Sequence, residues 1–305
     1  MSSSNFRAAV VRTPGGPDSI EFIELPVAEP APGEVRVRIA AAPVNPVDLA
    51  VASGPFHAMG LINQPDHTGL GWDFAGTVAA AGAGVDLAAG TRVAGLVDGF
   101  DRDFGTYAEQ LIVPATSLAV VPDGLDLAAA STVPLNALTA AQIVDLLGDA
   151  PADGSRLLVT GAAGAVGGYV TSLAQDRGWQ VTGLARAEDE DFVRGLGAEF
   201  TTNAEPGWDA VADGAVMQEQ ALALVREGGA FVGVLPSAKL PAERGIRVEA
   251  VMVRPDGSRL AGLLARTASG ELPARVHAVV PLDEVADAHR AVAKGGLRGR
   301  YVLTP

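Results

Sequence analysis

A glycine-rich segment in the middle of the chain has the residue types and spacing to hold a nucleotide. Gly161, Gly164 and Gly167 follow an apolar segment, 156–160, and lead into a helix-like run. Glycine permits a tight turn and a close backbone approach, and a helix N-terminus offers unpaired N–H groups to an anion. Three glycines are weak evidence alone, so the strand before and the helix after carry the argument. We expect a dinucleotide pyrophosphate to contact this loop, namely Gly161, Ala162, Gly164, Ala165, Val166 and Gly167.

The next expected strand, 181–186, ends where the adenosine ribose of such a nucleotide would lie. An acidic residue there would bind the 2′-hydroxyl, whereas an arginine would pair with a 2′-phosphate. Arg186 supplies a permanently charged, planar guanidinium. The acidic run 188–191 that follows could repel a phosphate, supply a ribose carboxylate, or simply occupy a helix N-terminus. We expect NADPH as the cofactor, with NADH as the alternative.

Composition excludes several classes of protein. The 305 residues carry a formal net charge of −14, which disfavours nucleic acid as a partner. No apolar run approaches the roughly 20 residues that span a bilayer, and the N-terminus lacks the apolar segment of a signal peptide, so we expect a cytoplasmic protein with no membrane association. With no cysteine, the chain has no disulfide, no thiolate metal ligand and no cysteine nucleophile.

The order of the expected elements indicates an α/β fold with two domains. Short strands separated by Gly and Pro dominate the N-terminal part and are typical of a β-barrel or sandwich. From residue 127 onward, helices and strands alternate, with one of the helices expected at 216–225, which predicts a doubly wound parallel sheet. The apolar run 248–253 looks like the last strand of that sheet, whose open edge needs a partner. We therefore expect a homodimer formed through these sheets.

Several short motifs resemble one family when their order and spacing are taken together. They are the glycine loop and residues 42–48, 71–78, 105–109, 137–140, 195–198 and 296–303. The chain resembles the medium-chain dehydrogenase/reductase superfamily, and more closely its zinc-independent quinone oxidoreductase branch, the zeta-crystallin-like group. The resemblance implies a GroES-like β-barrel catalytic and substrate domain, 1–126, completed by 271–305, and a Rossmann NADP-binding domain, 127–270.

The resemblance also bears on metal binding. Zinc-dependent members have a cysteine where Asn45 falls, and Gly-His-Glu where Gly71, Trp72 and Asp73 fall. A catalytic zinc needs about three converging protein ligands. The four histidines are scattered without motif spacing, so we expect no metal site.

Further site residues follow from the resemblance. It places Asn45 near the nicotinamide, where the amide could donate to a substrate oxygen, and Thr139 at the nicotinamide end of the cofactor. It assigns Arg300 to the cofactor phosphates. The cofactor cleft would include Gly233, Val234 and Leu235, and the substrate pocket would include Phe56, His57 and Met59. Several relatives carry a tyrosine shortly after the asparagine, but this chain has Pro46, Val47 and Asp48 there, which leaves the proton donor open.

These inferences predict an NADPH-dependent oxidoreductase that transfers hydride to a small molecule, a quinone or an α,β-unsaturated carbonyl, without zinc. Such a transfer needs alignment and help for a developing oxyanion more than it needs a catalytic dyad. Two alternatives stay open. One is an enoyl-thioester reductase of the polyketide type with the same fold, and the other is a non-catalytic, crystallin-like protein that only binds NADPH.

Overall fold

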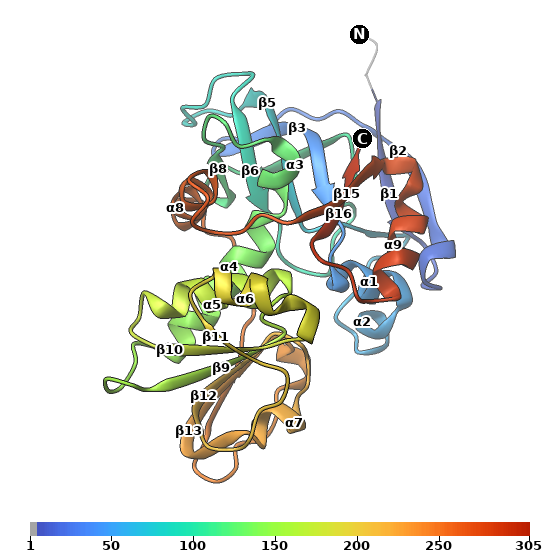
Figure 1. Cartoon of the computed structure of the whole chain (residues 1–305). Helices are drawn as coiled ribbons and strands as arrows, with labels where there is room; N and C mark the ends of the chain where they lie inside the picture. Colours follow the sequence, from blue (N-terminus) through green and yellow to red (C-terminus); the bar gives the residue numbers. More distant parts are fainter. Residues whose placement is uncertain (1–4) are drawn as a thin grey trace. The chain divides into compact units, whose positions relative to one another are not determined.

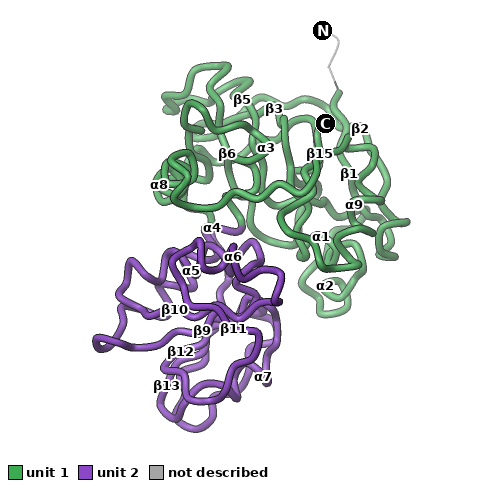
Figure 2. The backbone as a smooth tube through the Cα atoms, viewed as in Figure 1, with its two compact units in different colours: residues 1–135, 255–305 green, residues 136–254 purple. Residues whose placement is uncertain are grey.

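The computed structural model describes residues 5–305 and separates into two compact units (Figure 2). Of the described residues, the first unit contains 5–135 and 255–305, and the second contains 136–254. The sequence predicted domain boundaries after residues 126 and 270, and that division into folding domains stays a prediction. In the structure, Gly257 at the start of helix α8 (Gly257–Ala268) packs against the backbone of Leu118, so α8 lies within the first unit.

Strands from both ends of the chain build the first unit, and all of their pairings except the parallel β15–β16 pair are antiparallel (Figure 1). A three-stranded sheet has the order β2-β1-β4, comprising β1 (Asn5–Val11), β2 (Ile20–Pro26) and β4 (Thr68–Gly69). A larger sheet has the order β15-β16-β3-β5-β6-β8, with β7 also pairing with β3. Its strands are β3 (Glu34–Pro43), β5 (Asp73–Ala81), β6 (Arg92–Leu96), β7 (Gln110–Pro114), β8 (Leu118–Val120), β15 (Val276–Pro281) and β16 (Arg300–Thr304).

The core of this unit follows from the two-residue period of its strands. Along β3, Val35, Val37 and Ile39 are buried while the residues between them are more accessible, because successive strand side chains point to opposite faces. The C-terminal strand closes against the same strand, with Val302 opposite Pro43. Short helices cover the unit, namely α1 (Pro46–Ser53), α2 (Pro55–Ala58), α3 (Leu127–Ser131) and α9 (Val285–Ala293). The pairing brings the C-terminal tail to the strand that leads into Asn45.

A six-stranded, wholly parallel sheet forms the second unit and confirms the expected fold class. Its order is β11-β10-β9-β12-β13-β14, so the chain reverses direction across the sheet between β9 and β12. Ligands in such sheets bind beyond the carboxyl ends of the strands at this reversal. The strands are β9 (Arg156–Thr160), β10 (Gln180–Leu184), β11 (Glu199–Thr201), β12 (Trp208–Asp213), β13 (Val225–Gly233) and β14 (Arg247–Ala250), and the helices are α4 (Val133–Leu147), α5 (Ala165–Gln175), α6 (Glu190–Gly195) and α7 (Glu219–Leu222).

Two sequence-based assignments in this unit were wrong in extent. The expected helix 216–225 is only α7, because the backbone takes positive φ at Val216 (59°) and Gln218 (53°), a conformation outside the right-handed helix. The expected strand 248–253 ends at Ala250 as β14. Propensity and apolar character predicted both longer elements, and the local tertiary contacts overrode them.

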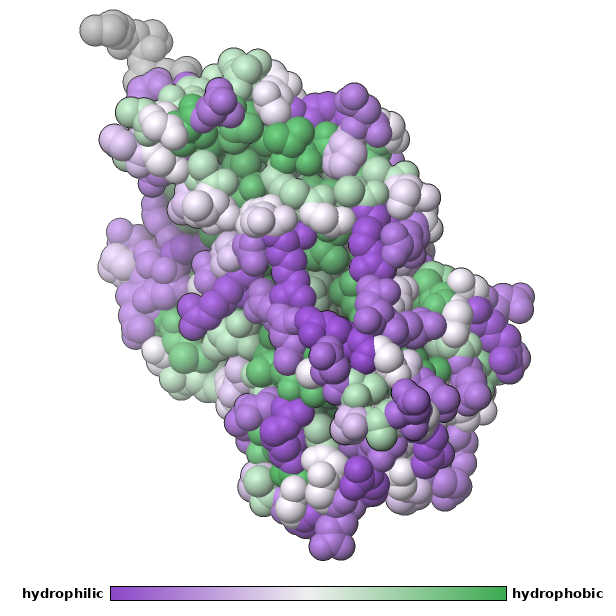
Figure 3. All heavy atoms as spheres, turned by 90° about the vertical axis from the view of Figure 1, so that its left-hand side faces the viewer, coloured by the Kyte–Doolittle hydropathy of each residue, from purple (hydrophilic) through white to green (hydrophobic). Residues whose placement is uncertain are grey.

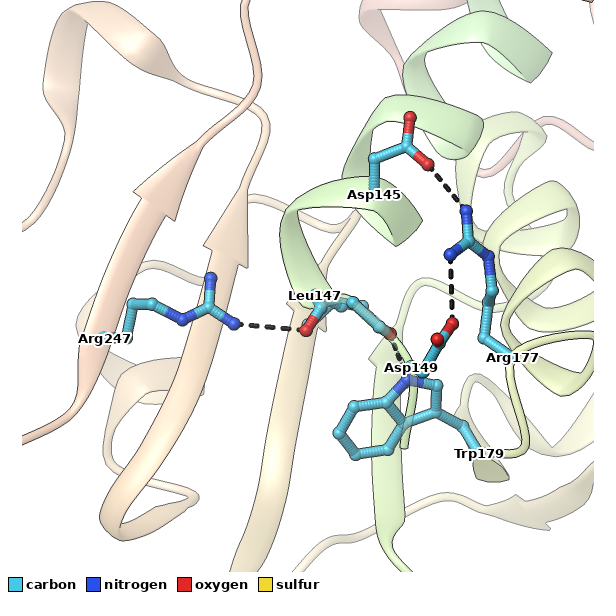
Figure 4. A network of polar contacts seen from close by, with 7 residues as sticks. Asp145, Leu147, Asp149, Arg177, Trp179 and Arg247 are labelled. Carbon is cyan, nitrogen blue, oxygen red and sulfur yellow. Dashed lines mark hydrogen bonds and ion pairs between the residues drawn. The ribbon is translucent and has the colours of Figure 1, made fainter. Parts of the chain in front are cut away.

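Side chains from other parts of the second unit donate hydrogen bonds to the carbonyl groups at the C-terminal end of α4 (Figure 4). The last carbonyl groups of a helix lack partners within the helix. Arg247 donates to the carbonyl oxygens of Leu146 (2.5 Å) and Leu147 (3.2 Å), and Trp179 donates from Nε1 to the carbonyl oxygen of Gly148 (2.9 Å). Arg177 pairs with Asp145 and Asp149 on the other side of this end. Together these contacts hold the C-terminal end of α4 against the segment before β10 and the first residue of β14.

The surface mixes polar and apolar side chains. On the face drawn in Figure 3, hydrophilic residues border smaller areas of hydrophobic ones. Large hydrophobic side chains that are exposed within residues 5–305 include Met59, Val120, Met252 and Val279. No helix in the described part of the chain combines the length and apolar character needed to cross a membrane.

Candidate active site

Asn45 begins helix α1 at the end of strand β3. Pro46 takes the first helical position, where its lack of an N–H costs nothing and its fixed φ suits the helix. The backbone N–H of Asn45 donates to Asp48 Oδ2 at 2.8 Å, in a capping box. Asn45 and Asp48 are both buried, with 1% and 0% of their surface exposed. The strand end and the helix start therefore hold two polar side chains in a dry environment.

The Asn45 amide is held by a neighbouring carboxyl group. Asn45 Nδ2 donates to Asp73 Oδ1 at 2.8 Å, with a longer contact to the carbonyl oxygen of Pro43 at 3.4 Å. The second oxygen of Asp73 accepts from the backbone N–H of Leu135 at 3.1 Å. The sequence offered Asn45 as a donor to substrate, and that role stays a prediction. Its pairing with Asp73, at the first position of β5, was not foreseen, because the two residues are 28 positions apart in the chain.

Burial shifts the pKa values of both carboxyl groups upward. Loss of hydration raises the pKa of Asp48 to about 6, although hydrogen bonds from the Asn45 and Gly71 backbones and from the Tyr107 hydroxyl oppose the shift. Burial, with a further contribution from the charge of Asp48, raises the pKa of Asp73 to about 8. The buried guanidinium of Arg300 faces both acids and favours their charged forms. Arg300, expected to reach cofactor phosphates, lies in this unit beside Asp73.

An aromatic group begins one residue before Asp73 in the chain. Trp72 directly precedes Asp73, and its ring meets Phe100 edge-on at 5.3 Å between centroids. The ring centroid of Phe100 lies in turn 4.2 Å from that of Phe56, one of the residues expected to line the substrate pocket. His57 Nε2 is 3.1 Å from the Thr68 hydroxyl, and burial lowers the pKa of His57. Met59 is 49% exposed. Sequence reasoning singled out Phe56 but missed its aromatic neighbour Phe100 and the contact of Phe100 with Trp72.

In the second unit, the glycine loop connects β9 to α5. Gly161 has φ of +63°, which only glycine adopts without strain, and the backbone N–H of Gly164 donates to the Gly161 carbonyl oxygen at 2.7 Å. Gly164 is the N-cap of α5 with φ of −78°. A Cβ on Gly167 would lie 2.1 Å from that same oxygen. Each glycine thus has its own role: Gly161 makes the turn, and Gly167 permits the close helix approach.

A buried aspartate, which the sequence reasoning missed, organises the loop beside these glycines. Asp213 ends β12, and its Oδ1 accepts from the Thr160 hydroxyl (2.6 Å). The same carboxylate accepts from the backbone N–H groups of Met217 (3.1 Å) and Gln218 (2.8 Å). The position of Asp213 at the end of a strand could have identified it from the sequence, because polar residues at the carboxyl ends of parallel strands often contact ligands.

The remaining expected cofactor residues lie on several elements. Arg186 follows β10, is 58% exposed and is 3.9 Å from the Glu188 carboxylate. Within the acidic run, Glu190 pairs with Arg194 of α6 at 2.7 Å. Gly233 ends β13, directly before Val234 and Leu235, and Thr139 is buried in α4. Arg186, Gly233 and the glycine loop all lie at carboxyl ends of strands of the same parallel sheet, where a dinucleotide would bind.

The donor set around Asn45 does not suit zinc. No group of three or more His, Cys, Asp or Glu side chains that could hold a metal ion occurs among residues 5–305. The Asn45 amide nitrogen is a donor toward Asp73, and the indole of Trp72 is a donor only. Zinc in proteins binds Cys, His and carboxylate groups.

Comparison with known proteins identifies the family. The family model for an alcohol dehydrogenase GroES-like domain matches residues 31–123, and that for a zinc-binding dehydrogenase matches residues 185–303. An NADPH-dependent alkenal/one oxidoreductase of Arabidopsis thaliana chloroplasts is 30% identical over 95% of this chain and 77% of its own length. The chain belongs to the medium-chain dehydrogenase/reductase superfamily.

Other members of the superfamily match with different coverage. A chloroplastic quinone-oxidoreductase homolog of Spinacia oleracea is 31% identical over 61% of this chain, and the match spans 56% of that protein. A trans-enoyl reductase of Aspergillus terreus is 33% identical over 55% of this chain and 48% of its own length. The quinone oxidoreductase structure from Coxiella burnetii superposes with a TM-score of 0.84 at 23% identity, covering 99% of this chain and 100% of that one. That similarity supports the fold, including the GroES-like unit.

Proposed function

We propose that this member of the superfamily is an NADPH-dependent oxidoreductase that reduces a small quinone or an α,β-unsaturated carbonyl without zinc. The buried Asn45–Asp73 pair is the observation that carries the proposal. It holds a polar amide in a buried site, where a hydrogen bond to a developing oxyanion is stronger than in water. Neither residue is a nucleophile aligned with a base, which suits a reaction driven by alignment and electrostatics.

The glycine loop and Arg186 support NADPH as the cofactor. A pyrophosphate at the start of α5 would meet the backbone N–H groups of Ala165, Val166 and Gly167 and the positive end of the helix. The exposed guanidinium of Arg186 can pair with a 2′-phosphate beyond the end of β10. When bound, NADPH supplies the hydride. We assign cofactor contacts also to Asn45, Thr139, Gly233, Val234, Leu235 and Arg300, and substrate contacts to Phe56, His57 and Met59.

The alternative of an enoyl-thioester reductase is supported by the similarity to a trans-enoyl reductase. The two activities share hydride delivery to a carbon conjugated with a carbonyl group, so they differ in the acceptor rather than in the residues assigned here. A protein that only binds NADPH is the remaining alternative. We also propose a homodimer that pairs through the open edge of β14.

The acceptor decides between these possibilities. NADPH oxidation is followed at 340 nm with a naphthoquinone, a simple enone and crotonyl thioester as parallel acceptors. Turnover of the quinone or enone in preference to the thioester is expected. Preference for the thioester would favour the alternative reductase, and NADPH binding without oxidation of any acceptor would favour the non-catalytic protein. Activity that survives EDTA dialysis, with metal content far below one zinc per chain, is expected as well.

A further inference from the structure

The indole N–H groups of the three tryptophans differ in their contacts. Trp179 Nε1 donates to the Gly148 carbonyl oxygen and Trp208 Nε1 donates to the Glu205 carbonyl oxygen, each at 2.9 Å. Trp72 is only 3% exposed, and its buried Nε1 meets no acceptor within residues 5–305. A buried donor without an acceptor is costly, so native proteins rarely keep one unless it has a ligand or another role.

The unpaired donor adjoins the candidate site in the chain and contacts an aromatic neighbour of the expected substrate pocket. Trp72 directly precedes Asp73, which accepts the hydrogen bond from Asn45. Its ring touches Phe100, which in turn touches Phe56 of the expected substrate pocket. The indole therefore belongs to an aromatic group with Phe100 and Phe56, one residue along the chain from the amide–carboxyl pair.

The surroundings of Trp72 fix its ring. The Arg102 guanidinium carbon lies 4.9 Å from the ring centroid, in cation–π contact. Arg102 is itself held by the carbonyl oxygens of Gly71 (2.6 Å) and Val97 (3.1 Å). A donor held in place before the reaction stabilises a developing negative charge without first having to reorganise.

We propose that the Trp72 indole N–H donates a hydrogen bond to the oxygen of the quinone or enone acceptor, with Phe100 and Phe56 contacting its flat carbon framework. This inference rests on the proposed function. As hydride reaches the acceptor, negative charge develops on that oxygen, and the indole N–H stabilises it. Tryptophan is a donor only, so the indole keeps its proton. Water supplies the proton that completes the reduced product.

Trp72→Phe tests the proposal because it removes the N–H and keeps an aromatic ring. Loss of one donor to a developing oxyanion lowers kcat by roughly 100-fold or more. We expect a fall of that order in kcat/KM for the quinone, an unchanged dissociation constant for NADPH and a melting temperature equal to or above that of the wild type. Trp179→Phe and Trp208→Phe are matched controls. Each breaks a hydrogen bond to a carbonyl group, so each should lower the melting temperature and keep the activity.

Nuclear magnetic resonance gives a readout that needs neither turnover nor a folded Trp72 variant. Protein labelled with ¹⁵N has one indole signal for each tryptophan, and the two control variants assign the signal of Trp72 by elimination. Adding menadione together with NADP⁺ should move the Trp72 indole proton downfield and leave the other two signals in place.

Two results would overturn the inference. They are a Trp72 signal that menadione does not move and a folded Trp72→Phe variant with wild-type kcat/KM. If that variant also has a reduced melting temperature, the N–H binds a structural water instead. If the wild-type protein reduces no acceptor, the proposed function fails instead, and the indole signal alone decides whether Trp72 binds the quinone.

Discussion

The hydroxyl of Thr160 donates a 2.6 Å hydrogen bond to Asp213, which connects the residue before the glycine loop to the end of the neighbouring strand. The same hydroxyl accepts from the backbone N–H of Ala215 at 3.1 Å. A Cβ on Gly161 would be 3.1 Å from the Ala215 side chain, so the two loops lie against each other. Asp213 and Thr160 therefore fix the relative positions of the glycine loop and the segment 214–218.

Thr160→Val should weaken both stability and NADPH binding. Valine keeps the shape of threonine but leaves Asp213 without this donor and Ala215 without its acceptor. Hydrogen bonds to charged groups contribute about 1.5–3 kcal/mol, so we expect the free energy of unfolding to fall by about 2 kcal/mol. Urea unfolding and NADPH titration measure the two effects. Thr160→Ser keeps the hydroxyl and is the control. Equal NADPH affinity in the two variants would show that the contact does not position the cofactor loop.

Arg186→Gln should remove most of the preference for NADPH over NADH. A charge-assisted contact with the 2′-phosphate contributes about 1.5–3 kcal/mol, which corresponds to roughly 10- to 100-fold in affinity. The dissociation constants of both cofactors are measured for both proteins. Arg194→Gln is a suitable control, because Arg194 pairs with Glu190 on α6. The assignment of Arg186 fails if wild-type protein binds NADPH and NADH equally well.

The glycine loop should respond differently at two of its positions. The Cβ of Gly164→Ala would lie 3.0 Å from the Gly161 carbonyl oxygen, so a small shift admits it and the fold should survive with weaker NADPH binding. The Cβ of Gly167→Ala would lie 2.1 Å from that oxygen, which requires the helix to move away. Thermal unfolding and NADPH titration are compared for the pair. A Gly164→Ala variant with native affinity would show that its backbone does not approach the cofactor.

His289 should make the protein less stable as the pH falls. Burial lowers the pKa of His289 to about 4, and its two ring nitrogens have no hydrogen-bond partner within residues 5–305. The unfolded chain, with a pKa near 6.5, takes up the proton first. The stability gained from keeping His289 neutral is therefore complete above about pH 6.5 and is lost as the pH falls toward 4. The free energy of unfolding changes by about 3 kcal/mol over this range.

His289→Leu should flatten that part of the pH dependence. The free energy of unfolding of wild type minus variant is measured between pH 4.5 and 8, and it should decrease as the pH falls. His277→Leu, at an exposed position of β15, controls for the loss of a histidine. A difference that does not change with pH would mean that His289 is hydrated in the folded protein.

Ala250→Pro should convert the proposed homodimer into a monomer. Strand β14 lies at the end of the parallel sheet, where it pairs with β13 on one side. The Val251 N–H donates to Gly233 of β13, so by strand alternation the Ala250 N–H faces the open edge. Proline removes that donor without touching the β13 ladder. Light scattering at micromolar concentration measures the mass, and a monomeric wild type would refute the edge pairing.

The sequence by itself determined the family, the parallel sheet and the glycine loop, because each depends on local order: an apolar strand, closely spaced glycines and a following helix. It also placed Arg186 at a strand end, since that position follows from counting along one strand–helix unit. It could not assign the individual glycines, because the sign of φ at Gly161 and the close approach at Gly167 depend on the backbone path.

Only the tertiary structure brought Asn45 to Asp73, Thr160 to Asp213 and Trp72 to Phe100. Each pair joins residues distant in the chain through sheet register and loop packing, which no local pattern encodes. Tertiary contacts also decided that Val216 and Gln218 leave the helical conformation, because Asp213 captures the N–H groups of Met217 and Gln218. The N–H groups in the first turn of a helix have no partner within the helix, and the buried carboxylate of Asp213 accepts hydrogen bonds from such groups just before α7.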